Sequence, residues 1–215
     1  GVERLDEARL GRPVVVVQVL DDPGQLPEGG AVVLLEQERE LVREGAAVVV
    51  ADIDREGAGA VAQTTNAEGG RGIAVSCDIR KETEIAGAVA AAVDGFGRLD
   101  IMFNNAAALP QEIRVQDIDI LTIETAARDE LMAGVLRSVM LGCRYAVLEM
   151  KRTGGGSIIN TSSMYGVNAF NRHPGYGTAK AGVIMLTQYV ATAFGRDNIR
   201  CNAIAPSMVR TDLLE

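Results

Sequence analysis

The sequence contains no tryptophan, and aromatic residues make up only 4% of its 215 residues. Proteins that bind single-stranded nucleic acid stack bases on aromatic side chains, so this scarcity argues against that class. The net charge of −8 argues against duplex nucleic acid and against anionic membrane surfaces, because both attract basic proteins. We therefore expect neither a nucleic-acid partner nor a membrane partner.

Cysteine is also scarce. Cys77, Cys143 and Cys201 are odd in number and far apart in the sequence, and each lies in an apolar run. They match neither a disulfide framework nor a zinc site, so we predict buried free thiols and no metal site. No apolar stretch approaches the roughly eighteen residues of a membrane span, and no signal peptide opens the chain. The sequence thus predicts a cytoplasmic protein in a reducing compartment.

What the sequence does contain is a regular alternation of short apolar runs and helical patterns. Hydrophobic residues at 47% and charged residues at 23% are typical of a soluble globular domain. Unbroken apolar runs favour strands that are covered on both faces of a parallel sheet. The predicted strands are 14–17, 47–53, 73–77, 99–103, 157–163 and 199–205, and the predicted helices are 34–44, 85–96, about 129–152 and 176–194. The pattern predicts an α/β fold: a doubly wound parallel sheet in a single three-layer domain at 13–215, after a polar lead-in at 1–12.

Four polar residues and one proline lie at the ends of these predicted strands. Asp52, Asp78, Asn105, Ser163 and Pro206 all fall at such ends. In open parallel sheets, ligands bind beyond the carboxyl ends of the strands, so these residues are candidates for a binding site.

Tyr176 and Lys180 are four residues apart, and Ser163 lies thirteen residues before Tyr176. On a helix, positions i and i+4 share one face. A lysine ammonium near a phenol lowers the tyrosine pKa, which would let Tyr176 exchange a proton near neutral pH. Ser163 could present its hydroxyl to the same substrate oxygen. The competing interpretation is a tyrosine at a helix start and a solvated lysine.

Together, the serine, the Tyr-x-x-x-Lys pattern and the preceding strand resemble the short-chain dehydrogenase/reductase family. The resemblance implies a Rossmann-like fold and an NAD-dependent oxidoreductase that interconverts a secondary alcohol and a ketone. In that reading Tyr176 exchanges the hydroxyl proton, Ser163 orients the substrate oxygen, and Lys180 lowers the Tyr176 pKa and binds the nicotinamide ribose. The hydride passes between the substrate carbon and the nicotinamide of the cofactor.

The same resemblance implies the cofactor site. Asp52 matches the family's ribose-binding acid, which would repel a 2′-phosphate, so NAD is favoured over NADP. Asp78 and Ile79 are similar to its adenine-contacting turn, and Asn105 belongs to a segment that resembles its Asn-Asn-Ala-Gly motif. The remaining implied contacts are Tyr176, Lys180, Val209 and Thr211. Family members are usually homodimers or homotetramers, with the long helix and the Tyr176 helix as the expected interface.

The chain departs from the family at several places. Glu28, Val32 and Leu34 occupy positions where the family has the glycines of its phosphate-binding loop, and Val135 replaces an asparagine that holds a proton-relay water. Family members also continue past the equivalent of Glu215 through a substrate-covering segment.

These departures leave two alternatives open. The chain could be a non-redox descendant that no longer binds dinucleotide, acting as another enzyme or as an assembly partner. It could also be a truncated or corrupted reading frame. His173 could be a second acid/base, but packing of a loop histidine before Pro174 is the favoured interpretation.

Overall fold

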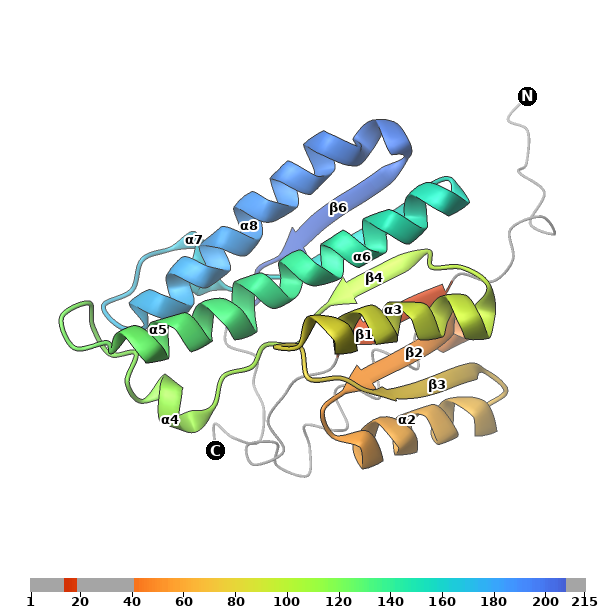
Figure 1. Cartoon of the computed structure of the whole chain (residues 1–215), viewed down its shortest axis with the longest axis horizontal. Helices are drawn as coiled ribbons and strands as arrows, with labels where there is room; N and C mark the ends of the chain where they lie inside the picture. Colours follow the sequence, from red (N-terminus) through yellow and green to blue (C-terminus); the bar gives the residue numbers. More distant parts are fainter. Residues whose placement is uncertain (1–13, 19–40, 208–215) are drawn as a thin grey trace.

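The computed structural model describes the backbone of residues 14–18 and all of residues 41–207 (Figure 1). The predicted polar lead-in, the expected phosphate-binding loop and most of the helix predicted at 34–44 lie outside these residues. The final turn of that helix is described, and it ends as expected at Gly45, whose φ is 86°.

Six parallel strands form one sheet in the order β3-β2-β1-β4-β5-β6. This order starts at β1 and winds outward in both directions, which confirms the predicted doubly wound sheet. Its switch point lies between β1 and β4, where binding crevices form. The strands are β1 (Val14–Gln18), β2 (Ala47–Asp52), β3 (Arg71–Ser76), β4 (Ile101–Asn104), β5 (Gly156–Thr161) and β6 (Ile199–Ile204).

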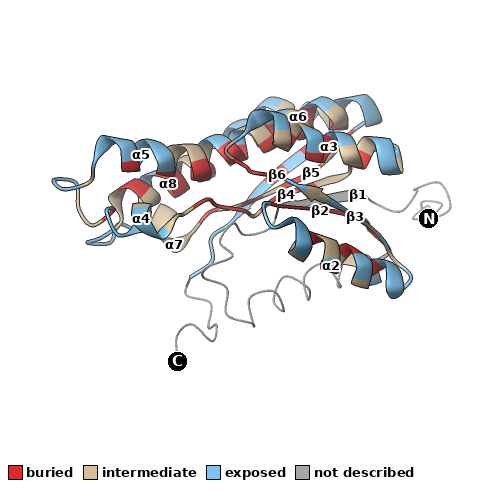
Figure 2. Ribbon diagram, turned by 60° about the horizontal axis from the view of Figure 1, so that its bottom comes forward, coloured by how far each residue is buried: buried red, intermediate tan, exposed pale blue. Residues whose placement is uncertain are grey.

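Helices cover both faces of this sheet (Figure 2). Alternate residues of β2 point to opposite faces: Val49 packs in the core beneath α3, α6 and α8, whereas Val48 and Val50 pack against α2. This two-sided burial explains the unbroken apolar run at 47–51. The helices are α2 (Arg55–Ala67), α3 (Glu82–Phe96), α4 (Gln111–Arg114), α5 (Thr125–Leu131), α6 (Ser138–Thr153), α7 (Met164–Val167) and α8 (Pro174–Phe194), with a short 3₁₀ turn at Gly195–Asp197.

The long predicted helix is confirmed, with two differences. It begins earlier, because α5 continues through a π-helical stretch, Met132–Arg137, into α6. Met140, which the pattern placed with Val139 on the inner face, is 50% exposed. Successive helical residues are about 100° apart, so these two neighbours cannot both face the sheet. Gly154, with φ of 93°, ends the helix as expected.

The expectation that no apolar stretch approaches a membrane span is wrong for the continuous helical segment Thr125–Thr153. By length and composition this segment could cross a bilayer, and half of its most apolar window is buried inside the fold. Core helices of soluble proteins have the same property, because one of their faces packs against a sheet.

Candidate active site

Several of the residues predicted at strand ends do lie along the carboxyl edge of the sheet. Asp52 ends β2, and Asn105 directly follows β4. Thr161, the last residue of β5, donates a hydrogen bond of 2.9 Å from its hydroxyl to the Asn105 side-chain oxygen. This bond ties together the ends of two strands on one side of the switch point.

Ser163 and Tyr176 are brought together by the loop and the short helix that follow β5. Ser163 caps α7, and its Oγ accepts a hydrogen bond from the backbone N–H of Tyr165 at 3.2 Å. The Ser163 side chain also makes a hydrogen bond with Tyr176. The structure therefore places two hydroxyl groups next to each other, as the sequence predicted, where both could contact one substrate oxygen.

Lys180 lies one helical turn after Tyr176, and its side chain is almost fully buried. Its Nζ donates a hydrogen bond of 2.7 Å to the backbone carbonyl of Thr161, and lies 5.7 Å from the centre of the Tyr176 ring. Burial lowers the pKa of Lys180 from 10.5 to about 8. The ammonium group is thus held under the tyrosine ring, at the end of β5.

The expectation that the pKa of Tyr176 is lowered is wrong for this structure. Burial is the largest effect on the tyrosine and raises its pKa, while the hydrogen bond with Ser163 opposes that rise. The lysine is directed at the Thr161 carbonyl, so burial of the phenol outweighs any attraction of the phenolate to the ammonium.

Val135, which the resemblance matches to the family's asparagine, is completely buried in the π-helical stretch. It packs with Ala107 and Ala179 in a small apolar cluster that Tyr176 also contacts. The carbonyl of the preceding Gly134 accepts a hydrogen bond of 3.2 Å from the Ala108 N–H. A valine side chain has no polar atom, so it offers no relay from this position.

Asp52 and Asp78 have carboxylates that are already partly engaged. Asp52 is 8% exposed, and its Oδ1 accepts a bond of 2.7 Å from the Asp54 N–H. Arg80 binds both oxygens of Asp78, at 2.9 and 3.1 Å, and this contact holds the pKa of Asp78 below its usual range. Ile79 is buried in the core, so only its backbone could contact a nucleotide. Val209 and Thr211 lie outside the described residues.

A buried polar cluster joins the strands beneath this edge. The Asn160 amide donates to the Thr187 hydroxyl at 2.9 Å and to Cys201 Sγ at 3.5 Å, while its oxygen accepts from Asn104 at 2.8 Å and from Cys143 at 3.6 Å. Two cysteines that are far apart in the sequence therefore meet around one asparagine. All three cysteines are free and buried, as predicted. Within residues 41–207, no cluster of three or more His, Cys, Asp and Glu side chains is arranged to hold a metal ion.

A cavity of about 260 Å³ opens beside Tyr176. Sequence reasoning missed most of its wall, because the lining residues come from loops and from the short helices α4, α5 and α7, which carry no long periodic pattern. His173, the candidate second acid/base, does line the cavity with Tyr176, but its Nδ1 lies 4.0 Å from a carboxylate oxygen of the buried Asp117. The other lining residues are Leu109, Arg114, Asp117, Leu131 and Tyr165.

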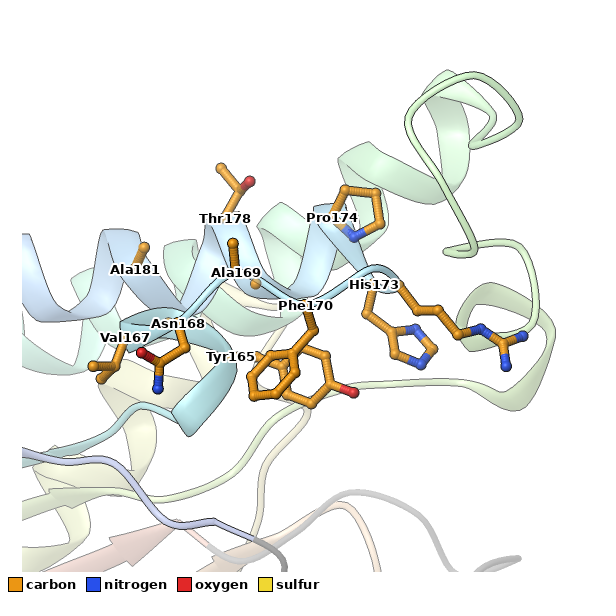
Figure 3. Close-up of a pocket in the computed structure, with 12 residues that line it drawn as sticks. Tyr165, Val167, Asn168, Ala169, Phe170, His173, Pro174, Thr178 and Ala181 are labelled. Carbon is orange, nitrogen blue, oxygen red and sulfur yellow. The ribbon is translucent and has the colours of Figure 1, made fainter.

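The loop between β5 and α8 contributes an aromatic cluster to the same region (Figure 3). The rings of Tyr165 and Phe170 lie 4.5 Å apart, and Tyr165 meets both His173 and Tyr176 edge-on, at 5.6 and 5.9 Å. A second hollow of about 360 Å³ lies between this loop and α8. The site thus combines hydroxyl groups and a buried lysine with a wall that is partly apolar and aromatic and also contains the charged Arg114 and Asp117.

Comparison with known proteins agrees with this geometry. The family model described as enoyl-(acyl carrier protein) reductase matches residues 38–215. A probable short-chain type dehydrogenase/reductase of Bradyrhizobium diazoefficiens is 38% identical over 174 residues, which cover 81% of this chain and 61% of that protein. The chain belongs to the short-chain dehydrogenase/reductase family.

Other relatives and solved structures support the same assignment. The probable galactose dehydrogenase of Rhizobium meliloti is 34% identical, over 90% of this chain and 74% of its own length. A short-chain dehydrogenase from Mycobacterium smegmatis aligns with a TM-score of 0.79 and 28% identity, over 94% of this chain and 79% of that one. The first curated relatives are matched over only 61% to 66% of their length.

Proposed function

We propose that this protein is an NAD-dependent oxidoreductase that interconverts a secondary alcohol and a ketone. The observation that supports this most is the contact between the Ser163 and Tyr176 side chains above the buried Lys180 ammonium. Side chains of these types at one sheet edge can bind a carbonyl oxygen, give it a proton and balance the resulting charge.

The described residues fit a nicotinamide dinucleotide. Asp52 offers a buried carboxylate at the end of β2, suited to accept hydrogen bonds from ribose hydroxyls. Asn105 and Lys180 lie at the ends of β4 and β5, on the other side of the switch point. When bound, the nicotinamide supplies or accepts the hydride. A solved xylitol dehydrogenase structure is described as NAD⁺-bound. It is 25% identical to this chain, with a TM-score of 0.79 over 94% of this chain and 72% of that one.

In the direction of reduction, the Tyr176 hydroxyl donates its proton to the substrate oxygen, and the Ser163 hydroxyl donates a hydrogen bond to the same atom. The raised pKa of Tyr176 keeps it protonated in the resting enzyme, ready to act as the acid. Lys180, charged at neutral pH, then stabilises the phenolate that remains. In oxidation the same groups act in reverse.

Asp52 is the proposed selectivity residue. Its negative charge would repel the 2′-phosphate of NADP, and its burial limits how far solvent can screen that repulsion. The remaining parts of the proposal are a small alcohol or ketone as substrate, held in the cavity beside Tyr176, and a cytoplasmic location, which the three free thiols support.

Two relatives act on substituted six-membered rings according to their names: the 2,5-dichloro-2,5-cyclohexadiene-1,4-diol dehydrogenase of Sphingobium indicum, 37% identical, and the cis-4-hydroxycyclohexanecarboxylate dehydrogenase of Sinomonas cyclohexanicum, 33% identical. The cavity beside Tyr176 has the apolar Leu109 and Leu131 and the ring of Tyr165 in its wall. Cyclic secondary alcohols are therefore the substrates to test first.

We also propose that the chain forms a homo-oligomer through the outer faces of α6 and α8, which pack side by side (Figure 1). Large apolar side chains are exposed there at helical spacing: Met140 and Leu148 on α6, Met185 and Tyr189 on α8. Association would remove this apolar surface from water.

The decisive experiment is a titration of the purified protein with NADH, followed by nicotinamide fluorescence, with NADPH in parallel. We expect saturable binding of NADH and weaker binding of NADPH. The matched variant Asp52→Asn removes the charge while keeping the shape, and should bring the two affinities closer together. Absence of binding at millimolar NADH would refute the dehydrogenase proposal and favour a non-redox member of the family.

A further inference from the structure

Asp117 is a buried acid far from the catalytic residues in sequence. It lies between α4 and α5, and it is 1% exposed. A buried carboxylate is costly unless hydrogen bonds satisfy its oxygens. Here both oxygens are satisfied by the first turn of α8: Oδ1 accepts from the Gly175 N–H at 2.8 Å, and Oδ2 accepts from the Tyr176 N–H at 2.9 Å.

The first turn of α8 lacks a cap of its own. The residue at the N-cap position is His173, which makes no side-chain capping bond and has a left-handed conformation with φ of 63°. Such a conformation is unfavourable for a residue with a side chain and persists only where neighbours hold it. Asp117 helps to hold His173 in this conformation, because the Asp117 backbone carbonyl accepts a hydrogen bond of 3.1 Å from the His173 N–H.

Asp117 therefore binds every available amide in this turn. Of residues 173–176, His173, Gly175 and Tyr176 donate to Asp117, and Pro174 has no N–H to donate. Gly175 adds to the closeness of the fit, since a Cβ there would lie 2.8 Å from Leu131 and 3.1 Å from the Asp117 carboxylate. The negative charge also favours the positive end of the helix dipole.

We propose that Asp117 is the positioning residue for Tyr176. Asp117, which lies 58 residues before Gly175 in the sequence, takes the place of a local helix cap. It fixes the backbone from which the Tyr176 side chain reaches Ser163 and the cavity. Without this anchor the first turn of α8 frays, and the phenol loses its fixed place beside Ser163. The consequence for turnover rests on the proposed function, whereas the anchoring itself does not.

The test compares Asp117→Ala and Asp117→Asn with the matched control Asp119→Asn. Asp119 belongs to the same loop, and its Oδ1 also accepts two backbone hydrogen bonds, but these come from Leu121 and Thr122 in that loop and not from α8. We expect kcat to fall at least tenfold in Asp117→Ala and less in Asp117→Asn, which keeps one acceptor oxygen. KM for NADH should change less than twofold, and the control should keep its activity. A kcat within twofold of the wild-type value in Asp117→Ala, measured well below its melting temperature, would overturn the proposal.

Amide hydrogen exchange followed by NMR tests the anchor without any activity. In the wild-type protein, the amides of Gly175 and Tyr176 should be protected, although amides in a first helical turn are normally free to exchange. In Asp117→Ala they should exchange at least tenfold faster, and in Asp119→Asn they should be unchanged. Unprotected amides in the wild type refute the anchor even if the variant fails to fold. Protected amides in a protein that binds no NADH would instead refute the proposed function and leave the anchor standing.

Discussion

Replacing Lys180 by methionine should stabilise the cofactor-free protein at neutral pH while removing its activity. Lys180 is 3% exposed, and burial lowers its pKa to about 8 from the 10.5 that it has when exposed. Methionine has a similar length and no charge, so it can fill the same space without the cost of a buried ammonium.

The magnitude follows from the pKa. Holding the charged lysine in the folded state costs roughly 3 kcal/mol, at about 1.4 kcal/mol for each pH unit of displacement. Loss of the hydrogen bond to the Thr161 carbonyl offsets about 1 kcal/mol of this gain. The expected net stabilisation is about 2 kcal/mol at pH 7, which raises the melting temperature by roughly 4 to 8 °C in a chain of this size.

This advantage should depend on pH in a defined direction. Below pH 8 Lys180 is charged in both the folded and the unfolded wild-type chain, so the full free-energy cost of burying the ammonium lowers the stability of the folded protein. Between about pH 8 and 10.5 the folded lysine is neutral while the unfolded one still binds a proton, so wild-type stability rises with pH relative to the variant. The difference between the two proteins should therefore shrink across this range.

Urea unfolding at pH 7, 8.5 and 10 measures both effects. The control is Lys151→Met, since Lys151 is half exposed in an ion pair of 3.0 Å with Asp197. That variant should stay within about 0.5 kcal/mol of the wild type at pH 7. If Lys180→Met is less stable than the wild type at pH 7, or if its advantage does not change between pH 7 and 10, the buried-charge argument is refuted.

Three further predictions concern the site, the core and the surface. Tyr176→Phe should lower kcat by roughly 10²- to 10⁴-fold in a steady-state assay, because it removes the acid/base group, and should leave NADH binding within twofold. Asn160→Ala should lower the free energy of unfolding in urea by about 2 to 4 kcal/mol, because the buried Asn104 amide and Thr187 hydroxyl each lose a hydrogen-bond partner. Met185→Glu should shift the protein toward monomer in analytical ultracentrifugation, because it puts a charge on the outer face of α8.

Each of these predictions has a matched control. Tyr145→Phe removes a hydroxyl that donates to Glu82 away from the cavity, and should leave kcat unchanged. Asn66→Ala removes exposed bonds to Gly72 and should cost only about 1 kcal/mol. Val115→Glu charges an exposed apolar residue that lies outside α6 and α8, and should leave the mass of the assembly unchanged. If a control changes as much as its partner variant, the assigned cause is wrong.

The sequence by itself determined the parallel sheet. Runs such as 47–51 are apolar at every position because both faces of β2 are covered, and this is visible without coordinates. Helix ends at Gly97 and Gly154 were also readable, since their φ values of 84° and 93° suit glycine. Helix α2 escaped sequence reasoning, because its buried positions are the small residues Ala58, Ala62 and Thr65, which form no strong apolar stripe.

The proposed catalytic residues could be named from their spacing, but their electrostatics could not. Spacing placed Lys180 one turn from Tyr176, yet only the fold shows that the lysine binds the Thr161 carbonyl and that burial raises the tyrosine pKa. Desolvation depends on everything packed around a group, and most of that comes from distant segments. Asp117 illustrates the same limit: its two bonds to the first turn of α8 span 58 and 59 residues. Local sequence fixes which groups are available, and tertiary packing decides which of them meet and how much water remains.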